Sequence, residues 1–255
     1  MKGVLGLFFA KSGTVEPCGL FSFQHIILLA ISCLTVFLML WLFGNISKEA
    51  VKRQIRAITV VIWILEICRI AYKLWCGDFK YPESYLPLYF CGIFLFALLL
   101  SSFGKGSFKR MGDVFLATGS LIGGIIFVVY PSTSLLYYPA LHFISVHSFI
   151  FHSAMIYVGL LIHKTKYIHL ELKDIMYHFV IVGIVCLVSW VVNEFTGCNF
   201  MFISRAVPGR FGEAMYSIIG GLYTPLFCFV QMVLPYCAVV WISRFYQIKI
   251  KKRNN

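Results

Sequence analysis

The chain has 255 residues, of which 60% are hydrophobic and 13% are charged. A soluble domain with so few charges would expose too much apolar surface, so the composition indicates a membrane protein. The net charge of +12 does not indicate nucleic-acid binding, because the basic residues lie in short loops beside apolar runs, as topology signals do.

Seven apolar segments follow in chain order, and each is long enough to cross a bilayer as a helix. They comprise residues 21–44, 57–76, 87–104, 112–131, 140–163, 175–194 and 217–243. The apolar run 3–10 is short and ends at Lys11, which favours an interfacial segment over a cleavable signal peptide. We therefore expect an all-α, seven-transmembrane-helix bundle that forms a single membrane domain over residues 1–255.

Lysine and arginine gather on one side of the predicted bundle, in the loops after the first, third and fifth spans and in the tail (Lys48, Lys52, Arg53, Arg56, Lys105, Lys109, Arg110, Lys164, Lys166, Lys173, Arg244, Lys249, Lys251, Lys252 and Arg253). The positive-inside rule places that side in the cytoplasm. The N-terminus is then outside and the C-terminus cytoplasmic in a multi-pass cell-membrane protein. The same loops are expected to contact anionic lipid headgroups.

The nine cysteines show no CxxC spacing, so the sequence predicts neither a zinc site nor a disulfide framework, and no metal or cofactor. Several cysteines within the spans are expected to be small apolar packing residues: Cys33, Cys68, Cys186, Cys228 and Cys237. Cys18, Cys76 and Cys198 fall on the predicted outer side. One disulfide among these three and three free thiols both remain open.

Charged residues within the second span require partners, because an ionisable group in a bilayer is costly. Glu66, Arg69 and Lys73 share one helix face at about 100° per residue. Two interpretations remain open. The strip is an internally paired Glu–Arg group, or it is a face that binds an anionic headgroup.

The predicted fifth span carries three histidines at intervals of five residues: His142, His147 and His152. A spacing of five residues rotates each by about 140°, so the three cannot line one face. This excludes a three-histidine metal site on that helix alone. His142 lies at the predicted outer interface, and the other two lie deeper.

Depth along the spans predicts a polar layer in the outer leaflet. At about 1.5 Å per residue, Arg69, Cys91 and His147 lie roughly 7–10 Å below the outer ends of their helices. Asn193 lies at the outer end of the sixth span. Glu66 and His152 fall nearer the midplane.

A thiol and an imidazole at one depth suggest a nucleophile and its base. An imidazole can take the thiol proton, and the thiolate can attack an acyl carbonyl. Cys91 and His147 are thus candidates, although a buried histidine more often serves as hydrogen-bonded structure.

At these residues the chain resembles a known family. The segments YLPLYFC (85–91), HFISVHSFIFH (142–152) and NEFTGCNFMFISRAVP (193–208), with His25 in the first span, are similar to motifs of YwaF-type integral membrane proteins. These are the bacterial relatives of eukaryotic transmembrane protein 164. Where that family has Asn-Tyr-Met, this chain has Asn199-Phe200-Met201.

The resemblance implies a seven-helix fold shared with membrane-embedded lipid hydrolases and acyltransferases. It also implies acyl transfer in ether-phospholipid metabolism through a cysteine and a histidine, which map by motif to Cys91 and His147. A bacterial plasma-membrane location would follow.

The sequence therefore predicts a lipid acyltransferase or hydrolase that acts on membrane lipids in the outer half of the bilayer. Substrate-binding or supporting roles are assigned to Glu66, Arg69, His152, Asn193 and Asn199. One alternative is a proton-coupled transporter or a lipid- or solute-binding protein without covalent chemistry, in which Glu66 and His152 would gate a proton or solute. Another is a sensor or assembly subunit whose polar groups are purely structural.

Overall fold

The structure is a computed structural model that describes residues 4–11, 13–77, 81–206 and 210–253. Within those ranges the regular elements are all helices. The chain forms two compact units: unit 1 comprises residues 1–80 and 120–167, and unit 2 comprises residues 81–119 and 168–255. The expectation of a single membrane domain stays a prediction.

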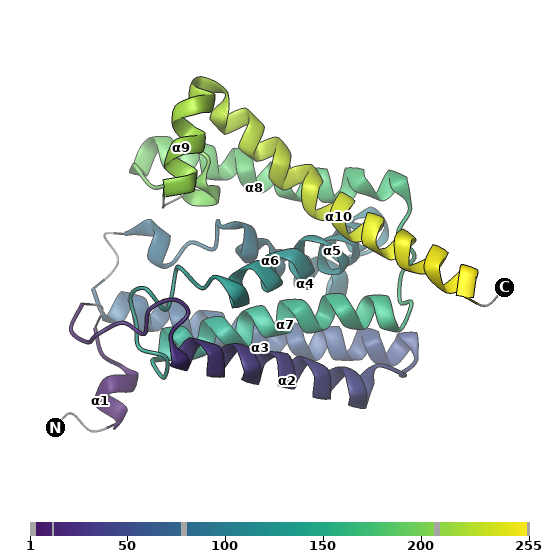
Figure 1. Cartoon of the computed structure of the whole chain (residues 1–255), viewed down its shortest axis with the longest axis horizontal. Coiled ribbons are helices and arrows are strands. Elements are labelled where there is room, and N and C mark those ends of the chain that lie inside the picture. Colours follow the sequence, from purple (N-terminus) through teal and green to yellow (C-terminus); the bar gives the residue numbers. More distant parts are fainter. Residues whose placement is uncertain (1–3, 12, 78–80, 207–209, 254–255) are drawn as a thin grey trace. The chain divides into compact units, whose positions relative to one another are not determined.

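Unit 1 is built around one long central helix. Its elements are α1 (Val4–Phe8), α2 (Phe23–Phe43), α3 (Lys48–Trp75), α7 (Phe143–Lys164) and all but the first residue of α6 (Gly119–Val129). Helix α7 packs against both α2 and α3 (Figure 1). At the start of α2, Ser22 accepts a hydrogen bond from the backbone N–H of His25, and the His25 ring contacts the Val128 carbonyl oxygen at 3.1 Å.

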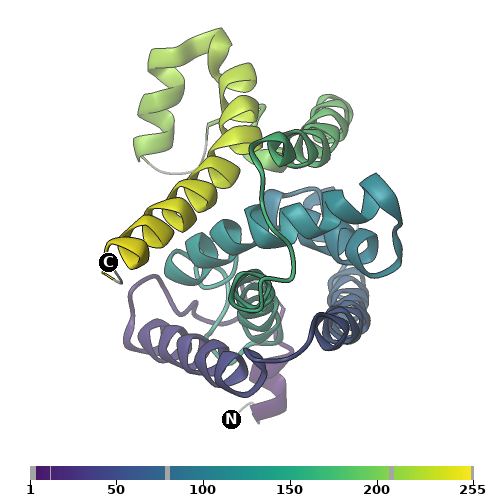
Figure 2. The same cartoon turned by 90° about the vertical axis from the view of Figure 1, so that its right-hand side faces the viewer.

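Unit 2 combines short and long helices. Its elements are η2 (Pro82–Ser84), η3 (Phe90–Gly92), α4 (Ile93–Phe103), α5 (Gly106–Ala117), η4 (Leu172–Asp174), α8 (Ile175–Thr196), η5 (Phe200–Phe202), α9 (Arg210–Ile219), η6 (Gly220–Leu222) and α10 (Tyr223–Arg253). Helices α4 and α5 pack together, and α8 packs against α5 and α10 (Figure 2).

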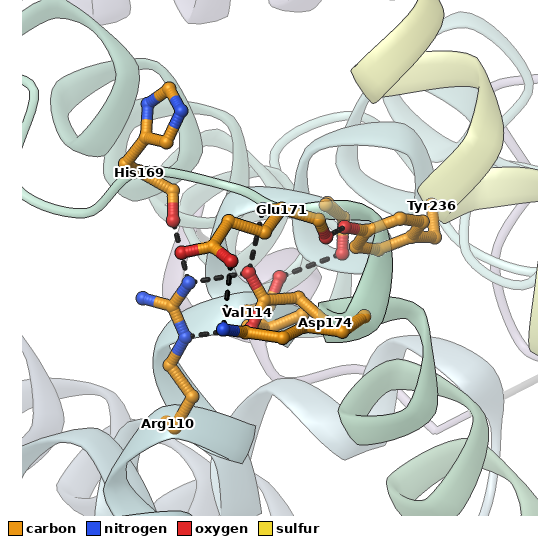
Figure 3. Close-up of polar contacts among 8 residues, drawn as sticks. Arg110, Val114, His169, Glu171, Asp174 and Tyr236 are labelled. Carbon is orange, nitrogen blue, oxygen red and sulfur yellow. Dashed lines mark hydrogen bonds and ion pairs between the residues drawn. The ribbon is translucent and has the colours of Figure 1, made fainter.

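An ionic cluster joins three helices of unit 2 (Figure 3). Arg110 of α5 donates hydrogen bonds to both carboxylate oxygens of Asp174, and the distance from its Nε to Oδ1 is 2.9 Å. Arg110 Nη2 also donates to the His169 carbonyl oxygen at 2.5 Å. Asp174 also accepts from the Glu171 N–H at 2.7 Å. The Tyr236 hydroxyl of α10 donates to the Glu171 carbonyl. The cluster therefore fixes the start of α8 to its two neighbours.

Five helical segments of the described chain are long and apolar enough to cross a membrane: Phe23–Phe43, Gly106–Val129, Phe143–Lys164, Leu172–Thr196 and Glu213–Phe245. The predicted spans 21–44, 140–163 and 175–194 coincide with α2, α7 and α8 within a few residues. An all-helical protein with several membrane-spanning helices is thus confirmed. The count of seven spans and the orientation of the termini stay predictions.

The second helix begins earlier than the predicted span 57–76. Ser47 caps α3 by accepting a hydrogen bond from the Ala50 N–H at 3.3 Å, and Glu49 lies in the first turn, where a negative charge favours the helix. Four basic residues predicted to lie in a loop are therefore helical: Lys48, Lys52, Arg53 and Arg56.

The predicted third span, 87–104, contains the short 3₁₀ helix η3 and an α-helix, α4, that begins only at Ile93. A β-carbon on Gly92 would lie 2.2 Å from the Pro87 carbonyl oxygen, so the chain doubles back tightly before α4 begins at Ile93. Helix α4 is about 16 Å long, which is shorter than the hydrocarbon core of a bilayer.

The predicted fourth span, 112–131, is interrupted. Helix α5 starts at Gly106 and ends at Ala117, and Thr118 has non-helical backbone angles (φ −125°, ψ −81°) before α6 begins. The Thr118 hydroxyl donates to the Val114 carbonyl at 2.7 Å and contacts His178 Nδ1 at 3.0 Å. The hydrophobic run alone could not reveal this break.

The predicted last span, 217–243, is divided at Gly220, whose φ of +58° lies in the left-handed region. Helix α10 begins three residues later, at Tyr223, and continues beyond the predicted end. The side chains of 246–253, which include most of the predicted basic tail, lie outside the described part. All nine cysteines are free thiols, including the three predicted outer ones.

Candidate functional site

An ion pair forms on α3 in unit 1 between a buried glutamate and a partly buried arginine. Arg69 Nε donates to Glu66 Oε2 at 2.9 Å, and Arg69 Nη2 donates to Glu66 Oε1 at 2.6 Å. Glu66 is only 4% exposed. The spacing of three residues brings the two side chains to the same helix face, so the paired Glu–Arg interpretation is confirmed. Binding of an anionic headgroup by Arg69 is untested.

His147 of α7 approaches the same carboxylate. Its Nε2 lies 3.4 Å from Glu66 Oε2, and its side chain is 4% exposed. That separation is longer than an ordinary N–H···O hydrogen bond, so the contact is chiefly electrostatic. Neither ring nitrogen of His147 has a hydrogen-bond partner among the described residues. Unit 1 thus presents a buried chain Arg69–Glu66–His147.

His142 and His152 have different surroundings. His152 Nδ1 contacts the Ser148 carbonyl at 2.7 Å, and its ring stacks on Phe127 with centroids 3.5 Å apart. His142 caps α7 and contacts the Ala10 carbonyl at 2.8 Å. Both rings have structural contacts, and the three histidines point to different neighbours, as their spacing predicted.

Cys91 lies in unit 2, in the short helix η3 that leads into α4. Its side chain is half-buried. The Gly92 N–H donates to the Tyr89 carbonyl at 2.8 Å, which closes the turn around the cysteine. Ser189 of α8 donates to the Leu88 carbonyl at 3.0 Å and fixes that turn to the helix.

Asn193 holds the segment that follows α8. Its Oδ1 accepts from the Phe200 N–H at 2.8 Å, and its Nδ2 donates to the Phe200 carbonyl at 3.1 Å and to Ser204 Oγ at 2.9 Å. Asn199 Oδ1 accepts from the N–H of Ser204 and of Arg205. The two asparagines therefore shape the segment 197–205.

This segment also contacts the turn that bears Cys91. The Tyr89 ring packs on Phe200 and Phe202, with centroids 5.3 and 5.2 Å apart. The Asn199 N–H donates to Glu83 Oε1 at 2.8 Å. Unit 2 thus brings together two of the three sequence motifs: 85–91, and 193–208 over its described residues 193–206. The third, 142–152, belongs to unit 1.

Comparison with protein families identifies the chain. The model of the TMEM164 family matches residues 20–242. The protein belongs to the TMEM164 family. Curated proteins and solved structures gave no match. The predicted relationship to transmembrane protein 164 is thereby confirmed, and the assignment to the bacterial YwaF-type branch stays a prediction.

The TMEM164-family match includes every predicted site residue. Sequence reasoning did not find Ser189 or Tyr89, which hold the cysteine turn to α8 and to η5. Neither residue is unusual in a membrane helix or at an interface, so no signal in the sequence distinguished them. The described residues contain no group of three potential metal ligands.

Replacing Asn193 with alanine should destabilise unit 2. The change leaves the Phe200 N–H without its partner and removes one of the two donors of the Phe200 carbonyl, and an unsatisfied buried group costs about 1–3 kcal/mol. We expect a lower midpoint of thermal unfolding in detergent micelles. Thr196→Ala is the matched control. Among the contacts described, the Thr196 hydroxyl donates to the Val192 carbonyl of its own helix and accepts from the nearby Cys198 N–H, so it does not hold Phe200. Equal midpoints for both variants would contradict the assigned role.

Proposed function

We propose that this TMEM164-family protein is a membrane acyltransferase or lipid hydrolase, in which Cys91 is the nucleophile and His147 is its base. The observation that carries the proposal is the buried His147 ring, which faces Glu66 through Nε2 and has an unpartnered Nδ1. A base held by a carboxylate is the arrangement that activates a nucleophile in many hydrolases.

The carboxylate favours one tautomer of the imidazole. With Glu66 beside Nε2, the neutral ring is most stable with its proton on that nitrogen, which leaves the lone pair on Nδ1. When Nδ1 takes a proton, the resulting imidazolium is stabilised by the same carboxylate. Arg69 positions Glu66 through two hydrogen bonds.

The proposed reaction has two steps. His147 Nδ1 takes the Cys91 proton, and the thiolate attacks the acyl carbonyl of a phospholipid. The ester bond breaks, a thioester forms, and the lysolipid oxygen receives the proton. The hydroxyl of a second lipid, or water, then attacks the thioester and restores the thiol.

The position of Cys91 just before a helix supports the proposed nucleophile. The residue is half-buried and lies immediately before the N-terminal end of α4. A helix N-terminus favours a nearby negative charge such as a thiolate. Asn193 and Asn199 support the reaction by holding the segment that packs on the cysteine turn, and His152 supports α7.

We propose that the chain crosses the membrane seven times, with its N-terminus outside and its C-terminus in the cytoplasm, in a bacterial plasma membrane. Helix α3 is long enough to span, and Arg69 offsets the charge of Glu66 within it. The site would then act on lipids of the outer leaflet, while the basic loops bind anionic headgroups of the inner leaflet.

Capture of the acyl-enzyme tests the proposal directly. Purified protein in nanodiscs is mixed with phospholipids that carry a labelled acyl chain, quenched in acid, digested and examined by mass spectrometry. The label is expected on Cys91 as a thioester that hydroxylamine removes. Cys68→Ser is a control that should label normally. Label retained by Cys91→Ala at the parent level would exclude the proposed nucleophile.

Proton-coupled transport is the alternative function, and substitution of Glu66 distinguishes it from acyl chemistry. Both Glu66 oxygens accept hydrogen bonds from Arg69, and Oε2 faces His147 Nε2. We expect Glu66→Gln to slow Cys91 acylation, because the base loses its oriented carboxylate. Proton-driven solute uptake in proteoliposomes that Glu66→Gln abolishes and Cys91→Ala leaves unchanged would instead establish transport.

A further inference from the structure

Two cysteines far apart in the sequence meet within unit 2. Cys186 lies near the middle of α8 and Cys228 in the second turn of α10, and both residues line one groove between these helices. The two helices pack along each other (Figure 1). A β-carbon on Gly183, one turn before Cys186, would lie 3.2 Å from the Met232 methyl carbon, so the helices approach closely at this level.

The thiol pair lines an apolar groove. The groove has a volume of about 280 Å³, and its walls include Gly183, Cys186 and Leu187 from α8, and Pro225, Cys228 and Met232 from α10. Leu187 is 62% exposed on the protein surface. Both helices belong to segments apolar enough to cross a membrane. The groove therefore offers the thiols to acyl chains.

The two thiols differ in accessibility. Cys186 is 3% exposed, whereas Cys228 is only partly buried. A reagent that enters the groove meets Cys228 more readily, while Cys186 is the more buried thiol of the same groove. This is the arrangement of an attacking cysteine and a resolving cysteine in thiol oxidation.

We propose that Cys186 and Cys228 form a dithiol–disulfide couple that is oxidised by fatty-acyl hydroperoxides of the surrounding lipid. The apolar walls and lateral opening favour a peroxide carried on an acyl chain over one dissolved in water. A disulfide between them would join α8 to α10 covalently. The inference is independent of the proposed acyl chemistry at Cys91.

The oxidation balances with the lipid peroxide as sole oxidant. The Cys228 sulfur attacks the terminal peroxide oxygen, the O–O bond breaks, and the departing alkoxide takes the thiol proton to become a lipid alcohol. Cys228 is then a sulfenic acid. The Cys186 sulfur attacks the Cys228 sulfur, the S–S bond forms, and hydroxide leaves with the Cys186 proton as water. Two electrons pass from the thiols to the peroxide.

The test uses the full chain in nanodiscs of saturated phospholipid, with or without added phospholipid hydroperoxide. After treatment, a membrane-permeant maleimide labels the remaining thiols, and mass spectrometry locates label and cross-linked peptides. We expect a Cys186–Cys228 disulfide, labelling of both residues reduced by about tenfold or more, and recovery after dithiothreitol. Cys237, exposed on the same helix, should stay labelled.

Single variants separate the two roles. In Cys186→Ser, the sulfenic acid on Cys228 has no resolving thiol, so dimedone should trap it there. In Cys228→Ser, dimedone should leave Cys186 unmodified. The inference is overturned if the disulfide does not form, if Cys237 is oxidised as fast as the pair, or if hydrogen peroxide at equal concentration oxidises the pair faster than the lipid hydroperoxide.

Discussion

Replacing His147 with alanine is expected to lower acyl transfer or hydrolysis by about 10²–10⁴-fold, the usual contribution of a general base. The physical reason is the loss of the unpartnered Nδ1 that would take the Cys91 proton. The measurement is release or transfer of a labelled acyl chain from phospholipids in nanodiscs, with protein folding checked by thermal unfolding. His163→Ala, in the last turn of the same helix, is the matched control and should keep parent activity.

The same experiment has a second arm. A nucleophile and its base act as a unit, so Cys91→Ala combined with His147→Ala should lose no more activity than Cys91→Ala alone. Full activity in a folded His147→Ala protein would remove the base from the mechanism. Two independent losses that multiply would show that the residues do not act on one step.

Removing the arginine of the buried ion pair is expected to have the largest effect on stability. Arg69→Met takes two hydrogen bonds from Glu66 and leaves a carboxylate that is 4% exposed. Breaking a buried pair from one side typically costs about 3–5 kcal/mol. The free energy of unfolding in mixed micelles is the measurement, and the variant should unfold at a lower denaturant fraction than the parent.

The double variant separates pairing from packing. Adding Glu66→Gln to Arg69→Met removes the unpaired charge and should restore part of the lost stability. Arg56→Met, on the same helix but near its start, controls for loss of a basic side chain. The importance of the pair would be refuted if Arg69→Met were as stable as the parent, or if the double variant were less stable than the single one.

The helices show which structural features the hydrophobic pattern predicts and which it does not. The uninterrupted apolar run 21–44 became α2 almost residue for residue, because an apolar segment in lipid must satisfy its backbone internally and does so as a helix. The same pattern could not place the break at Thr118, whose hydroxyl contacts His178 of another helix. Nor could it foresee the tight approach of Gly92 to Pro87. Contacts between distant residues decide such interruptions.

The candidate site shows the same division. The pairing of Glu66 with Arg69 follows from their spacing along one helix, so the sequence already contained it. The approach of His147 to Glu66 joins residues of α3 and α7, and no local pattern encodes that distance. The two hydrogen bonds between Asn193 and Phe200 could not be predicted from the sequence either, because they depend on how the chain turns after Gly197.

The sequence by itself determined that this protein is helical and crosses a membrane, and its short motifs predicted the relationship to transmembrane protein 164. These properties depend on composition, run length and residue order, which are local. Only the tertiary structure decided which polar groups come together: His147 with Glu66 in unit 1, and Cys186 and Cys228 in one groove of unit 2. In a bilayer most helix surfaces are equally apolar, so side-chain packing between helices, rather than hydrophobicity, selects those partners.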